Sequence, residues 1–378
     1  MCSAASSLNE SSDRHEPAEI ARDEIAAWRI IDAAANRAGE GLRVVEDYLR
    51  FGLDDRHLMT LCKVLRHDLT AMLAEFPNAL RLAARDTLAD VGTAVATSAE
   101  RTRPDLNAVA LASFKRTEQA LRSLEEYAKL VAPAAAAICQ GLRYRLYTLE
   151  RSTELTRRSG ERLAGARLYG LIDGGDSLEA FSDRAARLIE AGVHVLQLRD
   201  KQLDDRRLLE RARRLRALTA GTATLFIMND RPDLARLAAA DGVHLGQEEL
   251  GVKEARAIVG PWPLIGVSTH SLAQARAAVL AGASYLGVGP TFPSTTKSFA
   301  AFPGLELLRA VASEIRLPAF AIGGISLENL DDVMATGIGR VAVSRALGPT
   351  AESACGVREF LARLSNTTTT HGSSQGEG

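Results

Sequence analysis

The spacing of hydrophobic positions changes once along the chain, near residue 151. Before that point, apolar residues recur every three or four positions, as the core-facing stripe of an α-helix requires. The first stripe consists of Ile31, Ala34, Ala38, Leu42, Val45 and Leu49. Further stripes over 58–73, 108–131 and 138–149 follow it. The pattern predicts an all-α helical bundle domain over residues 25–151.

After Ala166, short apolar runs alternate with amphipathic helical patterns, such as 178–191. Buried parallel strands are apolar on both faces because helices cover both sides of the sheet. The eight runs are 168–172, 193–198, 224–228, 242–245, 264–267, 285–288, 319–322 and 341–343. Eight such units in about 200 residues predict a TIM (β/α)8 barrel over residues 166–364, an α/β fold. An open doubly wound sheet is the alternative.

Three segments are too polar to be assigned to either domain. Residues 1–24 and the low-complexity end 365–378 lack enough apolar surface to offset the entropy cost of ordering, so we predict disordered tails. Residues 152–165 (STELTRRSGERLAG) are predicted to form a polar linker between the two domains.

Composition narrows the functional classes. The 378 residues are 25% charged and 46% hydrophobic, with a formal net charge of −1, which is typical of a soluble globular protein. A balanced charge predicts neither nucleic acid nor a membrane surface as partner. The chain lacks a signal-peptide pattern and a run of the ~20 apolar residues that span a bilayer. The four cysteines lack metal or CxxC spacing, which favours a reducing, cytoplasmic location.

Polar residues follow the predicted strands, where the active site of a barrel lies. After the second strand comes Gln197-Leu198-Arg199-Asp200-Lys201, in which alternation puts the amide and both cations on one side. This cluster predicts an anion site, with a solvated loop as the alternative. Asn229-Asp230 follows the third strand and Glu249 the fourth. Carboxylate and amide oxygens suit Mg²⁺, although an Asx turn equally explains Asn229-Asp230 alone.

A second anion site is indicated on later strands. The loop after the sixth strand contains hydroxyls and Lys297, and it could close over a phosphorylated substrate. Gly323-Gly324 and Val343-Ser344 follow the seventh and eighth strands, where backbone N–H groups often bind phosphate in barrels. His270, after the fifth strand, is interpreted as a helix-start residue. Two anion sites with carboxylates between them indicate two phosphorylated substrates.

Taken in order, the runs QLRDK, ND, DGVHLGQE, GVST, GPTFPSTTK, AIGGI and VAVS closely resemble thiamine phosphate synthase over residues 166–364. The resemblance implies that a pyrimidine diphosphate and a thiazole phosphate combine to thiamine phosphate and pyrophosphate, with Mg²⁺. The related thiazole tautomerases, which isomerise the thiazole phosphate, are the alternative. They need no diphosphate and Mg²⁺ cluster.

The resemblance also implies roles for individual residues. Those matching the pyrimidine diphosphate site are Gln197, Leu198, Arg199, Asp200, Lys201, Asn229, Ser268 and Lys297. Those matching the thiazole phosphate site are Ser294, Thr295, Thr296, Gly324, Val343 and Ser344. Asp230 and Glu249 match the Mg²⁺ ligands, and Arg199, Lys201 and Lys297 would stabilise the leaving pyrophosphate. The sequence departs from the family at Glu249, usually aspartate, and at Ser294, usually threonine.

The helical half has a charged stripe opposite its apolar one, which an ordinary solvated helix face also explains. However, the run from Asp32 to Asp47 and the later Lys63-x₂-Arg66-His67 resemble a small helical domain often fused to this synthase. That resemblance implies phosphorylation of hydroxymethylpyrimidine phosphate, with ATP as co-substrate. Its candidate site residues are Asn36, Arg37, Arg43, Arg66, His67, Asp86 and Lys115. The alternative is a structural or dimerisation module, so a homo-oligomer is a possible assembly.

Overall fold

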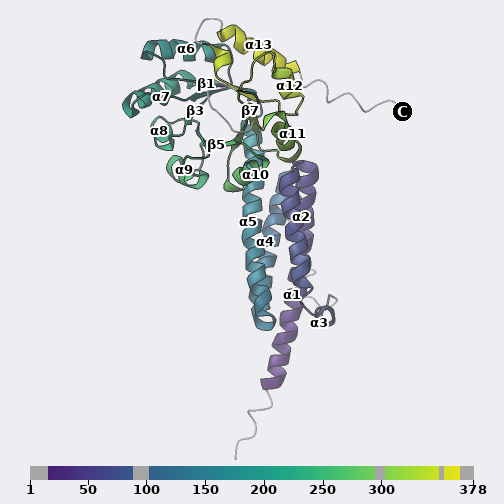
Figure 1. The fold of residues 1–378 in the computed structure, drawn as a ribbon. Helices are drawn as coiled ribbons and strands as arrows, with labels where there is room; N and C mark the ends of the chain where they lie inside the picture. The colour runs from purple at the N-terminus through teal and green to yellow at the C-terminus, as the bar shows by residue number, and fades with distance from the viewer. Residues whose placement is uncertain (1–15, 88–101, 294–302, 349–352, 367–378) are drawn as a thin grey trace, which may run out of the picture. The chain divides into compact units, whose positions relative to one another are not determined.

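The structure is a computed structural model that describes residues 16–87, 102–293, 303–348 and 353–366. Internal contacts divide the chain into two compact units. The helical unit comprises Met1–Asp54 and Leu58–Glu150, and the barrel unit comprises Asp55–His57 and Arg151–Gly378. Figure 1 shows long helices in the first unit and a ring of strands surrounded by helices in the second. No described helix combines the length and apolarity needed to cross a membrane.

The predicted helical bundle is confirmed. Its elements are α1 (Glu16–Asp47), the π-helical turn η1 (Tyr48–Gly52), α2 (Arg56–Leu73), α3 (Asn78–Ala84), α4 (Leu106–Val131) and α5 (Pro133–Arg162). Every residue of the first predicted apolar stripe is buried. A Cβ at Gly41 of α1 would lie 2.2 Å from Thr117 Oγ1 of α4. Glycine therefore lets these two helices approach closely.

Two predicted boundaries differ from the structure. α1 already begins at Glu16, inside the predicted tail 1–24, and α5 continues to Arg162, so most of the predicted linker 152–165 is helical. Arg157 pairs with Glu154 at 2.7 Å and with Glu161 at 2.6 Å, and such pairs stabilise a helix. The linker prediction was wrong because these paired charges resemble a solvated connection in sequence. Residues 1–15 and 367–378 of the predicted tails lie outside the described residues.

The predicted strands close into one parallel barrel in the order β1 to β8, which excludes the open-sheet alternative. The strands are β1 (Leu168–Ile172), β2 (Val195–Leu198), β3 (Leu225–Asn229), β4 (Gly242–Leu245), β5 (Leu264–Thr269), β6 (Tyr285–Val288), β7 (Ala319–Ile322) and β8 (Val341–Val343). The surrounding helices are α6 (Leu178–Glu190), α7 (Asp205–Thr219), α8 (Pro232–Leu237), α9 (Val252–Val259), α10 (Leu272–Ala281), α11 (Gly304–Glu314), α12 (Leu330–Met334), the 3₁₀ turn η3 (Arg345–Leu347) and α13 (Ser353–Asn366).

Local signals explain where several helices begin. Ser177, Asp204 and Ser271 each precede a helix and accept a hydrogen bond from a backbone N–H in its first turn. Such caps satisfy N–H groups that have no partner within the helix. These caps fix where α6, α7 and α10 begin after β1, β2 and β5.

Inward-facing side chains fill the barrel below that mouth. Their core includes Leu163, Tyr169, Val195, Ile227, Leu264, Tyr285, Phe320 and Ala342. A Cβ at Gly266 of β5 would lie only 2.1 Å from the ring of Tyr285. The absence of a side chain at Gly266 therefore makes room for a large aromatic ring in the middle of the barrel.

Candidate active site

A cavity of about 480 Å³ opens at the C-terminal ends of the strands. The predicted site residues that line it are Gln197, Arg199, Asn229, Ser268, Gly324, Val343 and Ser344. They come from β2, β3, β5 and β8 and from the loop after β7, so the fold brings together positions separated by up to 147 residues of sequence (344 − 197). Ser294, Thr295, Thr296 and Lys297 lie outside the described residues.

Some residues at the end of β2 and in the loop after it line the pocket, and others hold the surrounding structure in place. Gln197 and Arg199 line the pocket, whereas the side chain of Leu198 is fully buried in the core. Asp200 accepts hydrogen bonds from the backbone N–H groups of Gly174, Gln202 and Leu203 at 2.7–2.9 Å. Burial alone would raise the pKa of Asp200, but these backbone bonds outweigh it and lower that pKa. Asp200 thus holds two loops of the barrel mouth in place.

Asp230 has an unusual backbone. Its φ of +59° lies in the left-handed region, which costs energy for any residue other than glycine. Its carboxylate accepts a hydrogen bond from Asn229 Nδ2 at 2.6 Å and lies 3.8 Å from Lys201 Nζ. Strained residues of this kind often occur at functional sites.

The second predicted metal ligand lies beside the first. A Cβ at Gly246 would be 4.0 Å from both Asp230 Oδ1 and Glu249 Oε1, so both carboxylates border the same point after β4. Within the described parts of the chain, no group of three or more His, Cys, Asp and Glu side chains forms a complete metal centre. Two carboxylates are what Mg²⁺ needs from a protein when phosphate oxygens and water supply its remaining ligands.

A buried chain of hydrogen bonds crosses the barrel beneath the pocket. Gln197 Nε2 donates to the Tyr169 hydroxyl at 2.8 Å, which lies 3.0 Å from the Tyr285 hydroxyl. The Tyr285 hydroxyl lies 3.2 Å from His244 Nδ1, and His244 Nε2 lies 2.9 Å from Ser268 Oγ. Gln197 and Ser268 were predicted from the sequence, but the three groups that join them were not.

Burial determines the charge states along this chain. It lowers the pKa of His244 to about 4 and raises the pKa values of Tyr169 and Tyr285 well above their ordinary range. The imidazole and both phenols are therefore neutral at pH 7. Of these three groups, only Tyr169 and His244 line the pocket itself. The alternation of β4, which turns His244 inward, was the available sequence signal.

His270 also differs from its predicted role. It precedes α10, as expected, but it lines the pocket as well, and its Nδ1 bonds to the Gly289 carbonyl. Phe320 and Ile325 add an apolar wall. Gly323 has a φ of +103°, and a Cβ there would lie 2.8 Å from Pro290, so only glycine suits this turn at the edge of the pocket.

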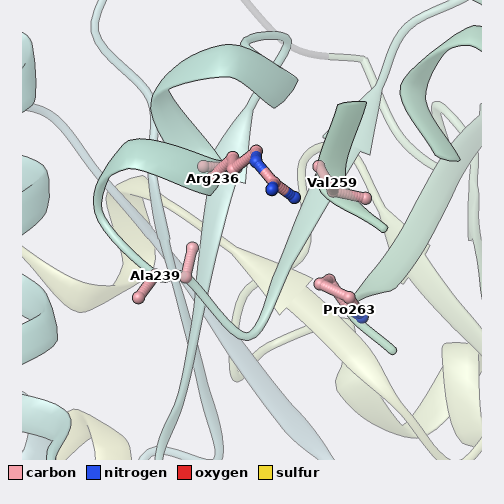
Figure 2. Close-up of a pocket in the computed structure, with 6 residues that line it drawn as sticks. Arg236, Ala239, Val259 and Pro263 are labelled. Atoms are coloured by element: carbon pink, nitrogen blue, oxygen red, sulfur yellow. The ribbon is translucent and has the colours of Figure 1, made fainter. Parts of the chain in front are cut away.

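A smaller pocket of about 310 Å³ lies at the other end of the barrel (Figure 2). It is bordered by Val259 at the end of α9 and by Pro263 just before β5. Arg236 supplies its charge, but that guanidinium already donates to the Ile258 carbonyl at 3.2 Å. Ligands of barrel enzymes bind at the C-terminal ends of the strands, so this pocket is a structural feature of the opposite face.

In the helical unit, the candidate residues fall into separate groups. Arg43 and Arg66 share Glu46, at 3.7 and 2.7 Å. Asn36, Arg37, His67 and Asp86 are exposed on or beside α1, α2 and α3. A pocket of about 690 Å³ near the α2–α3 turn is lined by residues between Thr70 and Arg81 and by none of these candidates.

Lys115 belongs to a different cluster, between α4 and α5. It contacts Glu118 at 3.1 Å and Glu150 at 2.8 Å. Burial, followed by the neighbouring Glu150, raises the pKa of Glu118 to about 7.

The closed barrel and the groups at its mouth define a (β/α)8 protein that collects cations, amides and carboxylates around one cavity. Residues 168–347 match the family model described as thiamine monophosphate synthase, and residues 29–152 match the ThiD2 family. The thiamine-phosphate synthase of Rhodopirellula baltica is 47% identical over 348 residues, or 89% of this chain and 93% of the relative. The chain belongs to the thiamine-phosphate synthase family.

A second synthase and one solved structure are also similar to this chain. The thiamine-phosphate synthase of Gloeobacter violaceus is 44% identical over 90% of this chain and 98% of its own length. A solved thiamine phosphate pyrophosphorylase from Pyrococcus furiosus is 32% identical, with a TM-score of 0.49 and coverage of 53% of this chain and 96% of that chain. The synthases of Rhodopirellula baltica and Gloeobacter violaceus align with both the helical unit and the barrel.

Proposed function

We propose that the barrel joins 4-amino-5-hydroxymethyl-2-methylpyrimidine diphosphate to a thiazole phosphate, giving thiamine phosphate and pyrophosphate. The observation that carries this proposal is that Arg199, Asn229 and Ser268 line one cavity, while Asp230, which follows Asn229 in the chain, has its carboxylate near that of Glu249 beside Gly246. Family membership supports the same activity.

The proposed chemistry follows from charge. The bond between the pyrimidine methylene and the diphosphate breaks, and the electron-rich aminopyrimidine stabilises the cation. The thiazole nitrogen then forms the new bond to that carbon, and pyrophosphate leaves. Arg199, Lys201 and Lys297 would stabilise the charge on the leaving group, and orientation of the two substrates would supply much of the rate.

Asp230 and Glu249 would hold Mg²⁺. When bound, the ion would neutralise charge on the diphosphate oxygens. Gly324, Val343 and Ser344, with Ser294, Thr295 and Thr296, would bind the thiazole phosphate. Gln197 would contact the pyrimidine ring, and the segment that continues from it to Lys201 would lie beside the diphosphate.

The test is to supply the full chain with both substrates and Mg²⁺ and to measure thiamine phosphate and pyrophosphate. Arg199→Ala should lower kcat/KM by roughly 10²–10³-fold, the scale of losing one preorganised stabilising group. Lys297→Ala should do the same. Arg207→Ala, an exposed arginine at the start of α7, is the control and should retain activity. Isomerisation of the thiazole without release of pyrophosphate would instead favour a tautomerase.

We further propose that the helical unit phosphorylates hydroxymethylpyrimidine phosphate at the expense of ATP. The match of residues 29–152 to the ThiD2 family favours this activity over a structural or dimerisation role. The two units would then catalyse consecutive steps, because the product of the first is a substrate of the second. Arg43 and Arg66, which meet at Glu46, are the candidates that the fold brings together.

Arg43→Ala should lower ATP-dependent formation of the pyrimidine diphosphate at least tenfold, because an anion loses its cation. Synthase activity should remain near wild type, and stability should change by no more than about 0.5 kcal/mol, as at other exposed helix positions. Arg145→Ala removes another exposed arginine, which pairs with Asp68 at 2.7 Å, and serves as the control. If the folded wild-type chain consumes no ATP with this substrate, the kinase proposal is wrong and the helical unit is a structural module.

A further inference from the structure

The buried chain of hydrogen bonds beneath the pocket links two residues that line the pocket. Its three middle groups, Tyr169, Tyr285 and His244, are here called the relay. They are 2%, 2% and 7% exposed, so an unmade hydrogen bond at any of them would be costly. The relay ends at two pocket-lining residues, the amide of Gln197 on β2 and the hydroxyl of Ser268 on β5.

Each member of the relay has one proton to donate along the chain. A phenol has one O–H and a neutral imidazole one N–H, so each receives one hydrogen bond and passes one on. When every relay proton is donated within the chain, the four bonds, of 2.8, 3.0, 3.2 and 2.9 Å, all point the same way. A reversed bond would either place two protons in one link or make one phenol accept twice, which leaves its own buried proton without an acceptor in the chain, and both arrangements are costly.

This constraint links the two ends. When Gln197 donates into the relay, its carbonyl oxygen stays available to accept from a ligand, and Ser268 keeps its proton to donate to one. When Ser268 donates into the relay, both roles reverse. We propose that the relay imposes opposite hydrogen-bonding polarity on Gln197 and Ser268, so that the pocket selects a flat ring with a donor at one end and an acceptor at the other.

The inference rests on the proposed function and deepens it. An aminopyrimidine has an exocyclic amine, a donor, and a ring nitrogen, an acceptor, on opposite sides of its ring. Tyr285 does not line the pocket and is therefore a positioning residue in this proposal, acting only through Tyr169 and His244.

Two glycines support the relay. The Cβ that Gly266 lacks would lie 2.4 Å from the Tyr285 hydroxyl, and the one that Gly287 lacks would lie 3.1 Å from the His244 ring. Both glycines face inward on β5 and β6, where larger side chains would displace these rings. The space in the barrel is thus shaped around the relay as well as around the cavity.

The test is a double-mutant cycle measured on kcat/KM for the pyrimidine diphosphate. Ser268→Ala should cost at least about tenfold in the wild-type background, since it removes an oriented donor. Tyr285→Phe removes the hydroxyl that joins Tyr169 to His244. In that background, Ser268→Ala should lower kcat/KM less than about threefold, because effects within one network are not additive. Thr269→Val is the control background. It removes a buried hydroxyl that donates to the Gly287 carbonyl. In this background, Ser268→Ala should still lower kcat/KM at least about tenfold.

A second measurement needs no turnover. Calorimetry compares the binding of 4-amino-5-hydroxymethyl-2-methylpyrimidine with that of its analogue lacking the amine. The preference for the amine should fall at least about fivefold in Tyr285→Phe and persist in Thr269→Val. Tyr169→Phe replaces Tyr285→Phe in both experiments if melting shows that the latter is unfolded.

The outcomes separate the two proposals. Independent, multiplicative effects of Ser268→Ala and Tyr285→Phe, or an unchanged preference for the amine, overturn the relay even when the wild-type enzyme makes thiamine phosphate. A wild-type chain that makes none overturns the proposed function, and the binding comparison then decides the relay alone.

Discussion

Burial of His244 determines the charge of its imidazole. Its imidazole lies inside the barrel between a phenol and a serine hydroxyl, with no carboxylate among its hydrogen-bond partners there to favour a positive charge. Desolvation lowers its pKa from 6.5 to about 4. Protonation would put a charge into the core and would also break the chain of hydrogen bonds that ends at Ser268.

This burial predicts a pH-dependent stability. Between pH 6.5 and about 4, the unfolded chain binds a proton at His244 that the folded chain does not, so stability is lost as the pH falls through this window. The loss from this residue approaches roughly 3 kcal/mol at its lower end. Burial also lowers the pKa values of His57 and His194, which add to the same trend.

Chemical denaturation at several pH values measures the effect. His244→Gln should flatten the dependence of unfolding free energy on pH between 6.5 and 4. His67→Gln, at an exposed position on α2, should leave it unchanged. Equal slopes in wild type and His244→Gln would show that the buried imidazole does not control this dependence.

Gly266 predicts a steric effect at the same scale. Gly266→Ala places a methyl group within 2.1 Å of the Tyr285 ring and should destabilise the barrel by about 1–3 kcal/mol, the usual cost of overpacking a core. Gly160→Ala in α5 is the matched control. A Cβ there meets nothing within 4 Å, and alanine favours a helix, so thermal unfolding should occur at the same or a higher temperature. Similar melting temperatures for the two variants would refute the prediction.

At the scale of elements, the ends of the strands concentrate the polar groups. β3 ends at Asn229, and the left-handed turn at Asp230 directs the chain into α8. β4 ends just before Gly246, beside which the carboxylates of Asp230 and Glu249 converge. Two adjacent βα loops thus assemble the proposed Mg²⁺ site, which neither loop contains alone.

Adjacent glutamates in the β4–α9 loop allow a controlled test of this site. Glu249→Gln should raise the Mg²⁺ concentration needed for half-maximal synthase activity by about tenfold or more, because a carboxylate ligand becomes neutral. Glu248→Gln, one residue earlier and also exposed, should not. A Mg²⁺ titration of initial rates compares the variants, and an equal response from both would exclude Glu249 as a ligand.

At the scale of the whole molecule, the boundary between the two units falls within α5, between Glu150 and Arg151. The later part of that helix is bonded to the barrel. Ser152 Oγ donates to the Val279 carbonyl at 3.4 Å, and Arg162 donates to the Trp262 carbonyl at 2.7 Å. The barrel's stability thus depends on residues that precede its first strand.

Two truncated proteins test this boundary. A fragment of residues 151–366 should fold and form thiamine phosphate. A fragment of residues 163–366 should melt at least about 5 °C lower, since it loses these bonds and the buried Thr153, Thr156 and Ser159. Circular dichroism melting compares the two. Identical melting temperatures would mean that the helix contributes nothing to the barrel.

Much of the architecture could be predicted from the sequence. The apolar stripe from Ile31 to Leu49 determined a buried helix face, and eight apolar runs determined eight parallel strands, because periodicity reports which faces are covered. The order of polar residues after those strands also predicted Gln197, Arg199 and Asn229 as site residues, and the family resemblance added Ser268. These inferences depend on local spacing, which the chain carries without reference to distant contacts.

Only the tertiary structure decided the rest. Whether Tyr169, Tyr285 and His244 face one another depends on barrel closure, which aligns β1, β6 and β4 across the interior. The helical state of residues 152–162 depends on burial of polar side chains that look solvated in sequence. In both cases the deciding energies come from desolvation and from hydrogen bonds between residues far apart in the chain, and local sequence patterns do not record these.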